Sequence, residues 1–286
     1  MLLNIPKAVI LSCFLLLTIL SLLIRTGRVK LPQGSYVYYL WAFFLFFAVS
    51  EFVSFQIGIW ILAAISFLSL REYFSMVDIR LQDRWAVLGA YLSIPFMTYY
   101  IQIAWYGLFI ITIPVYAFLV IPFLITLGGK EVRGSILSTG IIDLGLFLFV
   151  YCIGHIGYLA LFATFKAVLL ILAVALCDIN AHFLKVSRKP PAERFVLLYA
   201  VTAPQAVVLA WVLAPLAGIP YEHSVVLGFL IPFLVAMGRH TMDYLMADLG
   251  VDEESLRPGR GQVIANLRSF LYTAPAVFHY IRYFLT

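Results

Sequence analysis

Charged side chains are scarce in this sequence. Only 12% of its 286 residues are charged, whereas a soluble globular domain carries roughly 25%. Hydrophobic residues make up 64% of the chain and the mean hydropathy is +1.02. No polar stretch is long enough to form a separate domain. The composition therefore excludes a soluble fold and predicts a single membrane domain that covers residues 1–286.

Cysteine is also rare, and the common motifs of enzyme active sites are missing. Cys13, Cys152 and Cys177 each lie in an apolar run without metal-ligand spacing, so we interpret them as small buried hydrophobic residues. The sequence has no Walker phosphate loop, no G-x-S-x-G elbow and no H-E-x-x-H zinc motif. It also lacks the D-x-x-D-G-x-x-A-R pattern of CDP-alcohol phosphotransferases. These absences argue against the enzyme classes that depend on those motifs.

Long apolar runs fill the chain from end to end. A membrane-spanning helix needs about 20 mostly apolar residues, and lipid cannot satisfy the backbone groups at an open sheet edge. We therefore expect an all-α polytopic integral membrane protein with nine to ten transmembrane helices. The expected spans are 8–24, 36–50, 53–70, 85–100, 103–127, 136–153, 157–184, 195–216, 224–244 and 269–285.

Basic residues fall on alternate loops between these runs. They follow the first, third, fifth, seventh and ninth spans, at Arg25, Arg28, Lys30, Arg71, Arg80, Arg84, Lys130, Arg133, Lys185, Arg188, Lys189, Arg194, Arg257, Arg260 and Arg268. The other loops have almost no Lys or Arg and carry Glu51, Gln102, His155 and the pair Glu222–His223. Because cytoplasmic loops carry the positive excess, we expect the basic loops in the cytoplasm and a bacterial inner membrane as the location. The net charge of +5 is then a topology signal and does not indicate nucleic-acid binding.

Ionisable residues inside apolar spans are costly, which makes them functional candidates. They are Asp143, Asp178, His182, Arg239, His240 and Asp243. Arg239 and Asp243 are one helical turn apart, and we expect them to form an ion pair. That pair could be purely structural, or it could be a phosphate-binding arginine held by an aspartate. Asp178 and His182 suit either a weak metal site or contacts with lipid headgroups.

The longest polar segment is 245–268. Within it, the stretch from Arg257 to Gly261 combines two guanidinium groups with a flexible backbone. This combination suits a lipid phosphate or a nucleotide, and it equally suits an ordinary turn. Aromatic residues cluster at 36–46, 95–106 and 270–284, which we interpret as interface belts in preference to a ligand cage.

Three stretches of the chain are similar to a known pattern. The pattern's tail is G-D-x-x-x-S-x-x-K-R-x-x-x-x-K-D, then P-G-H-G-G-x-x-D-R-x-D-S, then an aromatic helix. This chain has GRHTMDYLMADLGVDEESLRPGRGQVIANLRS followed by an aromatic stretch, and it keeps the frame at Gly238, Asp248, Gly250, Pro258, Gly259, Gly261 and Ser269. CDINAHF at 177–183 is similar to A-D-x-x-A-Y-F, and ILAAISFLSLREYF at 61–74 is similar to an early helix that ends in glutamate. This pattern resembles the phosphatidate cytidylyltransferases, or CDP-diacylglycerol synthases, most strongly in 222–286 and 171–185. The resemblance implies their helical membrane fold, places Asp178 on the family's aspartate, and implies a homodimer or a complex with another lipid enzyme.

The departures from the pattern affect its charged positions. In this chain, Arg239 replaces the family's aspartate after the glycine, Asp243 replaces its serine, and Arg260 replaces its histidine. The remaining replacements are Met246 and Ala247 for Lys-Arg, Asp252 and Glu253 for Lys-Asp, and Ala265 to Arg268 for D-R-x-D. The family's S-P-x-K-T segment has no counterpart here. The family is expected to make CDP-diacylglycerol from CTP and phosphatidate, with carboxylates holding the divalent metal that nucleotidyl transfer needs. At least two of those metal ligands are lost.

We therefore expect a divergent, non-catalytic member that binds an anionic phospholipid or accompanies an enzyme of phospholipid synthesis. The candidate phosphate or lipid contacts are Arg239, Arg257, Arg260, Asp178, Asp243 and His182. One alternative is an active cytidylyltransferase with a rearranged site, which would use Mg²⁺ and CTP. Another is a lipid transporter or flippase, for which the chain offers few polar residues inside the spans.

Overall fold

Helices account for every regular element that the structure describes. The computed structural model describes residues 5–28, 35–128, 131–186, 189–251, 255–257 and 259–286. The elements are α1 (Ile5–Arg25), α2 (Ser35–Phe52), α3 (Phe55–Met76), η1 (Leu81–Asp83), α4 (Arg84–Gln102), α5 (Tyr106–Ile111), η2 (Thr112–Ala117), α6 (Phe118–Gly128), α7 (Ser135–Leu146), η3 (Phe147–Cys152), α8 (Ile153–Phe183), α9 (Pro191–Ala217), α10 (Tyr221–Asp248) and α11 (Gln262–Phe284). The expected all-α class is confirmed.

The helices have the length and composition of a membrane protein. Six helical stretches in the described residues are long and apolar enough to cross a membrane: Lys7–Arg25, Phe55–Met76, Tyr106–Gly128, Ser135–Phe183, Ala192–Ala217 and Tyr221–Asp248. The apolar part of α2, Val37–Phe52, is shorter. Each backbone group inside such a helix bonds within its own segment, which is what the hydrocarbon core requires. The chain is therefore a helical integral membrane protein.

The expected loop around His155 is wrong. The chain stays helical across this position, through α7, the π-helical turns of η3 and the first part of α8, and His155 is fully buried within α8. Gly154 and Gly157, which lie close to it, allow neighbouring side chains to pack against the helix backbone. A Cβ on Gly154 would lie 3.1 Å from Cε2 of Phe109, and one on Gly157 would lie 2.5 Å from Cδ1 of Ile59. Small residues therefore serve close helix packing here and do not end a helix.

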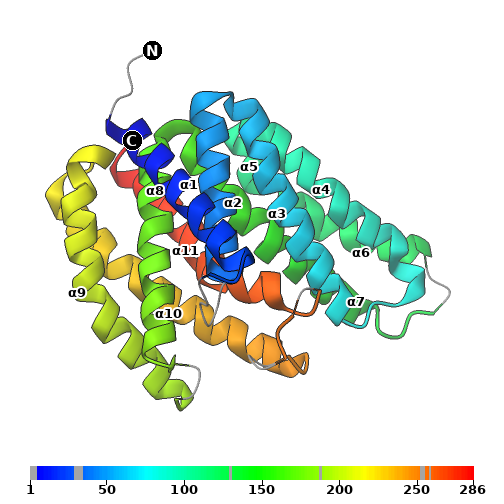
Figure 1. The fold of residues 1–286 in the computed structure, drawn as a ribbon. Helices are drawn as coiled ribbons and strands as arrows, with labels where there is room; N and C mark the ends of the chain where they lie inside the picture. Colours follow the sequence, from blue (N-terminus) through cyan, green and yellow to red (C-terminus); the bar gives the residue numbers. More distant parts are fainter. Residues whose placement is uncertain (1–4, 29–34, 129–130, 187–188, 252–254, 258) are drawn as a thin grey trace.

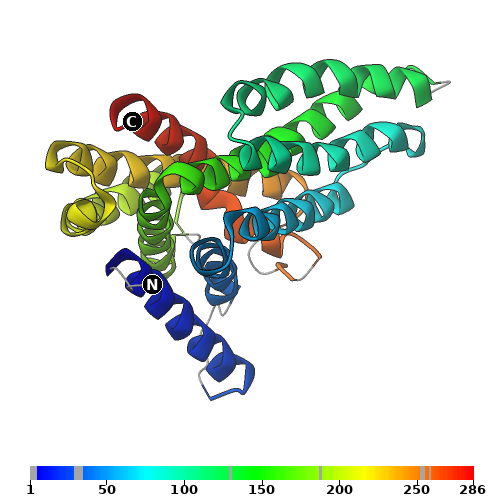
Figure 2. The same ribbon diagram turned by 90° about the horizontal axis from the view of Figure 1, so that it is seen from above.

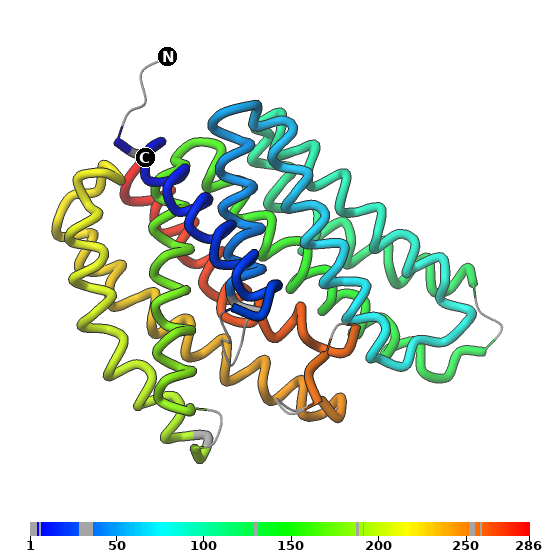
Figure 3. Tube along the Cα trace, viewed as in Figure 1, coloured from blue at the N-terminus to red at the C-terminus, as the bar shows by residue number. Residues whose placement is uncertain are grey.

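The break in this long helical run lies further along, at Ala163. Its φ of −152° and ψ of 66° are not helical, and the trace turns back at this point, so that the rest of α8 runs down beside α9 (Figure 3). The hydroxyl of Thr164 donates a hydrogen bond to the carbonyl of Ala160 (3.0 Å), which satisfies a backbone acceptor next to the break. The sequence predicted two helices, 136–153 and 157–184, and in the structure the break between them lies at Ala163 and not beside His155.

The basic loops share one side of the bundle. In Figure 1 the C-terminal ends of α1, α3, α6, α8 and α10 all point to the lower side, whereas the start of α1 and the end of α11 lie on the upper side. In the sequence, basic residues follow each of these five helices. Lys30, Lys130 and Arg188 lie outside the described residues.

Aromatic residues of α2 form the core and not an interface belt. Phe43, Phe44, Phe46 and Phe47 are all buried, because α2 packs against α1, α3, α8 and α11. The expectation of a belt at 36–46 is therefore wrong for these residues. Cys152 and Cys177 are buried as expected, and Cys13 is half-buried. α11 lies among α2, α3, α8 and α10, and its first two turns carry the polar cluster described below.

Candidate functional site

Asp178 is the centre of a buried polar cluster. Its Oδ1 accepts hydrogen bonds from Nη1 of Arg239 (2.7 Å) and from the hydroxyl of Ser269 (2.5 Å). Its Oδ2 accepts a hydrogen bond from the hydroxyl of Tyr39 (2.7 Å). All four residues are buried. Both carboxylate oxygens of Asp178 are thus satisfied, one of them by a permanent cation.

Four helices bring these groups together. Tyr39 comes from α2, Asp178 from α8, Arg239 from α10 and Ser269 from α11. α10 approaches α11 closely because residue 238 is glycine: a Cβ there would lie 3.1 Å from the carbonyl oxygen of Arg268. The resemblance assigned Gly238 and Ser269 to its frame, and both contribute to this junction.

The expected ion pair between Arg239 and Asp243 is wrong. Arg239 pairs with Asp178, and Asp243 pairs with Nη1 of Arg268 from α11. The exposure of the two aspartates explains the choice, since the side chain of Asp178 is 3% exposed and that of Asp243 is 23% exposed. The more deeply buried carboxylate has the greater need of a cation. Helical spacing alone did not reveal the partners because both come from other helices.

Glu72 lies at the start of α11. Its Oε2 accepts a hydrogen bond from the backbone N–H of Ile264 (3.0 Å), in the first turn of that helix. The carboxylate is buried, and its Oε1 has no partner among the described residues. A carboxylate at a helix N-terminus satisfies a free N–H group and complements the positive end of the helix dipole. Sequence reasoning did not select Glu72 as a site residue, although it is the glutamate that ends the early helix of the resemblance.

The loop from Arg257 to Gly261 forms a tight turn. The N–H of Arg260 donates to the carbonyl of Arg257 (2.9 Å), and Gly259 and Gly261 have φ values of +80° and +81°. A Cβ on Gly261 would also lie 2.8 Å from Cγ1 of Val251, so this position requires glycine. Arg257 and Arg260 are exposed, unlike Arg239. Pro258, Asp252 and Glu253 lie outside the described residues.

The cluster does not fit a divalent metal. The described residues hold no group of three or more His, Cys, Asp or Glu side chains that could bind a metal ion. His182 is at the end of α8 with its ring against Phe183, at 5.9 Å between ring centroids. Mg²⁺ needs carboxylate oxygens that are free to coordinate it, and those of Asp178 already accept three hydrogen bonds. The guanidinium of Arg239 also repels a cation at that position.

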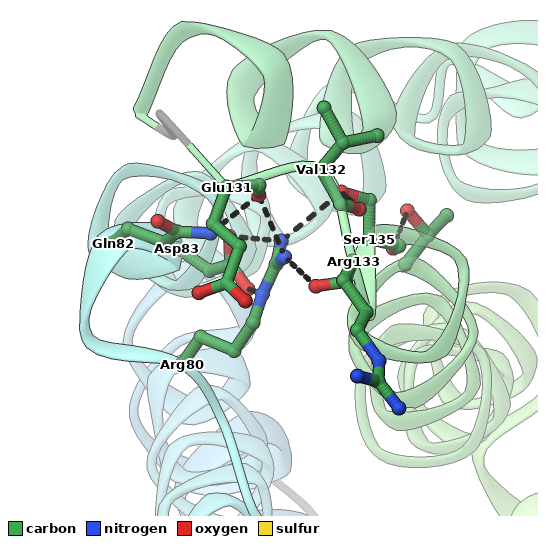
Figure 4. A network of polar contacts seen from close by, with 8 residues as sticks. Arg80, Gln82, Asp83, Glu131, Val132, Arg133 and Ser135 are labelled. Carbon is green, nitrogen blue, oxygen red and sulfur yellow. Dashed lines mark hydrogen bonds and ion pairs between the residues drawn. The ribbon is translucent and has the colours of Figure 1, made fainter.

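A third arginine–aspartate pair lies in the connection between α3 and α4 (Figure 4). Nε and Nη2 of Arg80 donate to the two oxygens of Asp83 (2.8 and 2.9 Å), and these hydrogen bonds raise the pKa of Arg80. Nη1 donates to the backbone carbonyls of Glu131 (3.2 Å) and Arg133 (2.7 Å). Arg80 therefore joins the α3–α4 connection to the segment before α7. The sequence identified Arg80 only as a topology signal.

Comparisons with known proteins give one distant relative. The chain is similar to the uncharacterized protein YnbB of Escherichia coli K12, with 27% identity over 240 residues that cover 77% of this chain and 78% of that protein. No protein-family model matches the sequence, and no solved structure matches it.

Proposed function

We propose that this chain is a cytidylyltransferase-like membrane protein that does not catalyse nucleotidyl transfer and that binds an anionic phospholipid at its basic side. The observation that carries the proposal is the pairing of Asp178 with Arg239. The resemblance puts metal-binding carboxylates at 178 and 239, and here a guanidinium bonded to Asp178 (2.7 Å) takes the place of the metal charge. The old cation position is filled by the protein itself.

This replacement bears on catalysis through electrostatics. Phosphoryl and nucleotidyl transfer depend on metal ions that neutralise charge developing on the phosphates. A guanidinium is a fixed positive charge with donors and no acceptor, so it cannot bind the metal ion that this chemistry uses. Arg239 is bonded to Asp178, and Arg268, at another carboxylate position of the pattern, is bonded to Asp243. Both carboxylates are therefore paired with an arginine.

The lipid phosphate is assigned to Arg257 and Arg260. Both are exposed at the α10–α11 connection on the basic side of the bundle, and the guanidinium group matches phosphate geometry with two parallel hydrogen bonds. Arg260 is the stronger candidate because Gly259, beside it, is exposed with nothing within 4 Å of its Cβ position and so leaves room for close approach. Arg239, Asp178 and Asp243 then support the site from inside, and His182 lies at the same side, at the end of α8.

The proposed topology has ten crossings, with the basic loops in the cytoplasm and the protein in a bacterial inner membrane. Its support is the position of the helix ends in Figure 1 together with the positive charge of the loops on that side. The ten crossings are α1, α2, α3, α4, α5 to α6, α7 to Ala163, the remainder of α8, α9, α10 and α11. A second copy or another enzyme of lipid synthesis is the proposed protein partner.

The test of the non-catalytic proposal is an assay of the purified protein with CTP, phosphatidate and Mg²⁺. We expect no release of pyrophosphate and no CDP-diacylglycerol above a no-protein control. Activity that is lost on Asp178→Ala or Asp243→Ala substitution would overturn the proposal and point to an active, rearranged site. Arg239→Asp combined with Ala265→Asp is not expected to create activity, because Met246 and Ala247 still lack the Lys-Arg charge.

The test of lipid binding is a titration of detergent-solubilised protein with short-chain phosphatidate. We expect binding at this loop to be weakened about tenfold or more by combined Arg257→Ala and Arg260→Ala substitution, since each basic residue near anionic lipid contributes about 1 kcal/mol. Arg133→Ala is the matched control, because Arg133 is also an exposed arginine and lies in a different basic connection, before α7. Equal loss in the control would mean that binding follows overall charge and not this loop.

A further inference from the structure

An apolar groove opens on the side of the bundle away from the Arg257–Gly261 loop. It lies between α1 and α2 on one side and α9 on the other, with α8 between them, and its volume is about 580 Å³. Figure 2 shows α1 standing at the edge of the bundle beside α8 and α9. α8 contributes Leu172, Ala175, Leu176 and Ile179, which share one face of the helix. Gln205 of α9 is the polar residue of the lining.

Gln205 belongs to an amide pair at the polar end of the groove. Nδ2 of Asn180 donates to Oε1 of Gln205 (2.8 Å), and Gln205 is exposed. Two primary amides offer four N–H groups, and this bond uses one of them. An exposed amide pair is costly against hydrocarbon but suits the ester carbonyls of a phospholipid, which accept hydrogen bonds at the membrane interface. The amide pair therefore indicates where in the groove the ester group of a lipid would bind.

The chain beyond this pair is basic. α8 ends at Phe183, and the α8–α9 connection carries Lys185 and Lys189, followed by Arg194 in the first turn of α9. The guanidinium Nε of Arg194 donates to the carbonyl of Lys189 (2.5 Å), which brings these residues together. Positive charge at the polar end of an apolar groove is complementary to a lipid with an anionic headgroup.

We infer that this groove binds one anionic phospholipid, with an acyl chain along α8, its ester group at Asn180 and Gln205, and its phosphate at the basic α8–α9 connection. This site is separate from the one proposed at Arg257 and Arg260. The surroundings of the groove favour a lipid: its lining is apolar along α8, its polar end carries the amide pair of Asn180 and Gln205, and the connection that follows is basic.

The test fills the groove and counts the lipid that stays bound. Wild-type protein and variants are reconstituted in vesicles of equal parts phosphatidylglycerol and phosphatidylcholine, extracted in mild detergent, and examined by native mass spectrometry. Ala175→Phe places a ring on the floor of the groove. Ala200→Phe is the matched control, because Ala200 is exposed on α9 outside the groove lining. We expect wild-type and Ala200→Phe protein to retain one phosphatidylglycerol in the groove. We expect the amount retained by Ala175→Phe to be at least tenfold lower.

Two further variants keep the result interpretable. Gln205→Leu preserves the size of the side chain and is expected to reduce retained phosphatidylglycerol severalfold, even if Ala175→Phe fails to fold. Arg257→Ala with Arg260→Ala is expected to leave this lipid in place, so a failure at that loop is distinct from a failure of the groove. Full retention in Ala175→Phe and Gln205→Leu, or equal retention of phosphatidylcholine by the wild type, would overturn the inference. So would a change from dimer to monomer in Ala175→Phe without loss of lipid, since a second copy would then occupy the groove.

Discussion

Two arginine–aspartate pairs in this protein have similar geometry and different surroundings. Arg239 contacts Asp178 at 2.7 Å and Arg80 contacts Asp83 at 2.8 Å. The first pair joins α10 to α8, and its side chains are only 7% and 3% exposed. The second joins residues three apart in sequence, and Arg80 is 21% exposed. Asp83 is 0% exposed, so both carboxylates are buried, and the pairs differ in the exposure of the arginine and in whether they join two helices.

This difference changes what each pair contributes. Asp178 in its apolar surroundings depends on Arg239, Ser269 and Tyr39 for every hydrogen bond it makes, so the pair fixes how four helices meet. Arg80 is near water and also donates hydrogen bonds to two backbone carbonyls, so it links the α3–α4 connection to the segment before α7. The lesson is that charge in the interior specifies helix arrangement, whereas the same charge at the surface steadies loops.

Removing the buried cation gives the largest expected effect. Arg239→Met leaves the Asp178 carboxylate buried without its counter-charge, and we expect a loss of about 3–5 kcal/mol in unfolding free energy. The measurement is denaturant unfolding in a fixed detergent. Asp178→Asn combined with Arg239→Met should recover part of this loss, because the remaining polar group is neutral. If the double variant is as unstable as the sum of both single variants, the pair is not coupled.

Glu72 tests an intermediate case, a buried carboxylate whose partner is a backbone N–H. Glu72→Ala removes the acceptor at the start of α11, and we expect a loss of about 1 kcal/mol, as for other lost helix caps. Glu72→Gln keeps a carbonyl oxygen for Ile264 and should lose less, because only the interaction with the helix dipole is weakened. Unfolding free energies of the two variants decide between them. Equal losses would show that the charge matters and the hydrogen bond does not.

The Arg80–Asp83 pair gives the smallest expected effect, because Arg80 is 21% exposed and lies near water, although Asp83 is buried. Arg80→Ala breaks the contacts with Asp83 and the two backbone carbonyls, and we expect the melting temperature in detergent to fall by a few degrees, less than for Arg239→Met. Arg84→Ala is the matched control, since Arg84 is also basic, lies at the same connection and forms none of these bonds among the described residues. A fall in Arg84→Ala as large as that in Arg80→Ala would mean that overall charge at this connection is responsible.

Much of the secondary structure could be predicted because it follows from composition and lipid. Apolar runs of the length of a bilayer must be helical, and nearly every expected span corresponds to a helix. The error at His155 has a specific cause. Glycine beside a polar residue indicates a turn in a soluble chain, but Gly154 and Gly157 provide close packing against Phe109 and Ile59. Sequence spacing does not distinguish a glycine that ends a helix from one that receives a neighbouring helix.

The candidate site was only partly predictable. The sequence selected Asp178, Arg239 and Asp243 because charge inside an apolar span is costly and needs a partner. It assigned the wrong partner, since the residue one turn away was visible and Asp178, 61 residues away, was not. Tyr39 and Glu72 were not selected, because neither a tyrosine in an aromatic run nor a glutamate at a helix end stands out by itself.

The sequence by itself determined that this protein lies in a membrane, that it is helical, and that its basic connections alternate along the chain. These properties depend on the composition and the order of residues, because the length, hydropathy and flanking charge of each segment determine how it lies in the bilayer. Only the tertiary structure decided which charges meet, because helix packing brings Asp178, Arg239, Ser269 and Tyr39 together from four separate segments. It also decided that Glu72 of α3 accepts a hydrogen bond from the first turn of α11 and that an apolar groove remains between α1 and α9. Contacts between distant segments depend on how helices tilt and pack, and no local pattern records that.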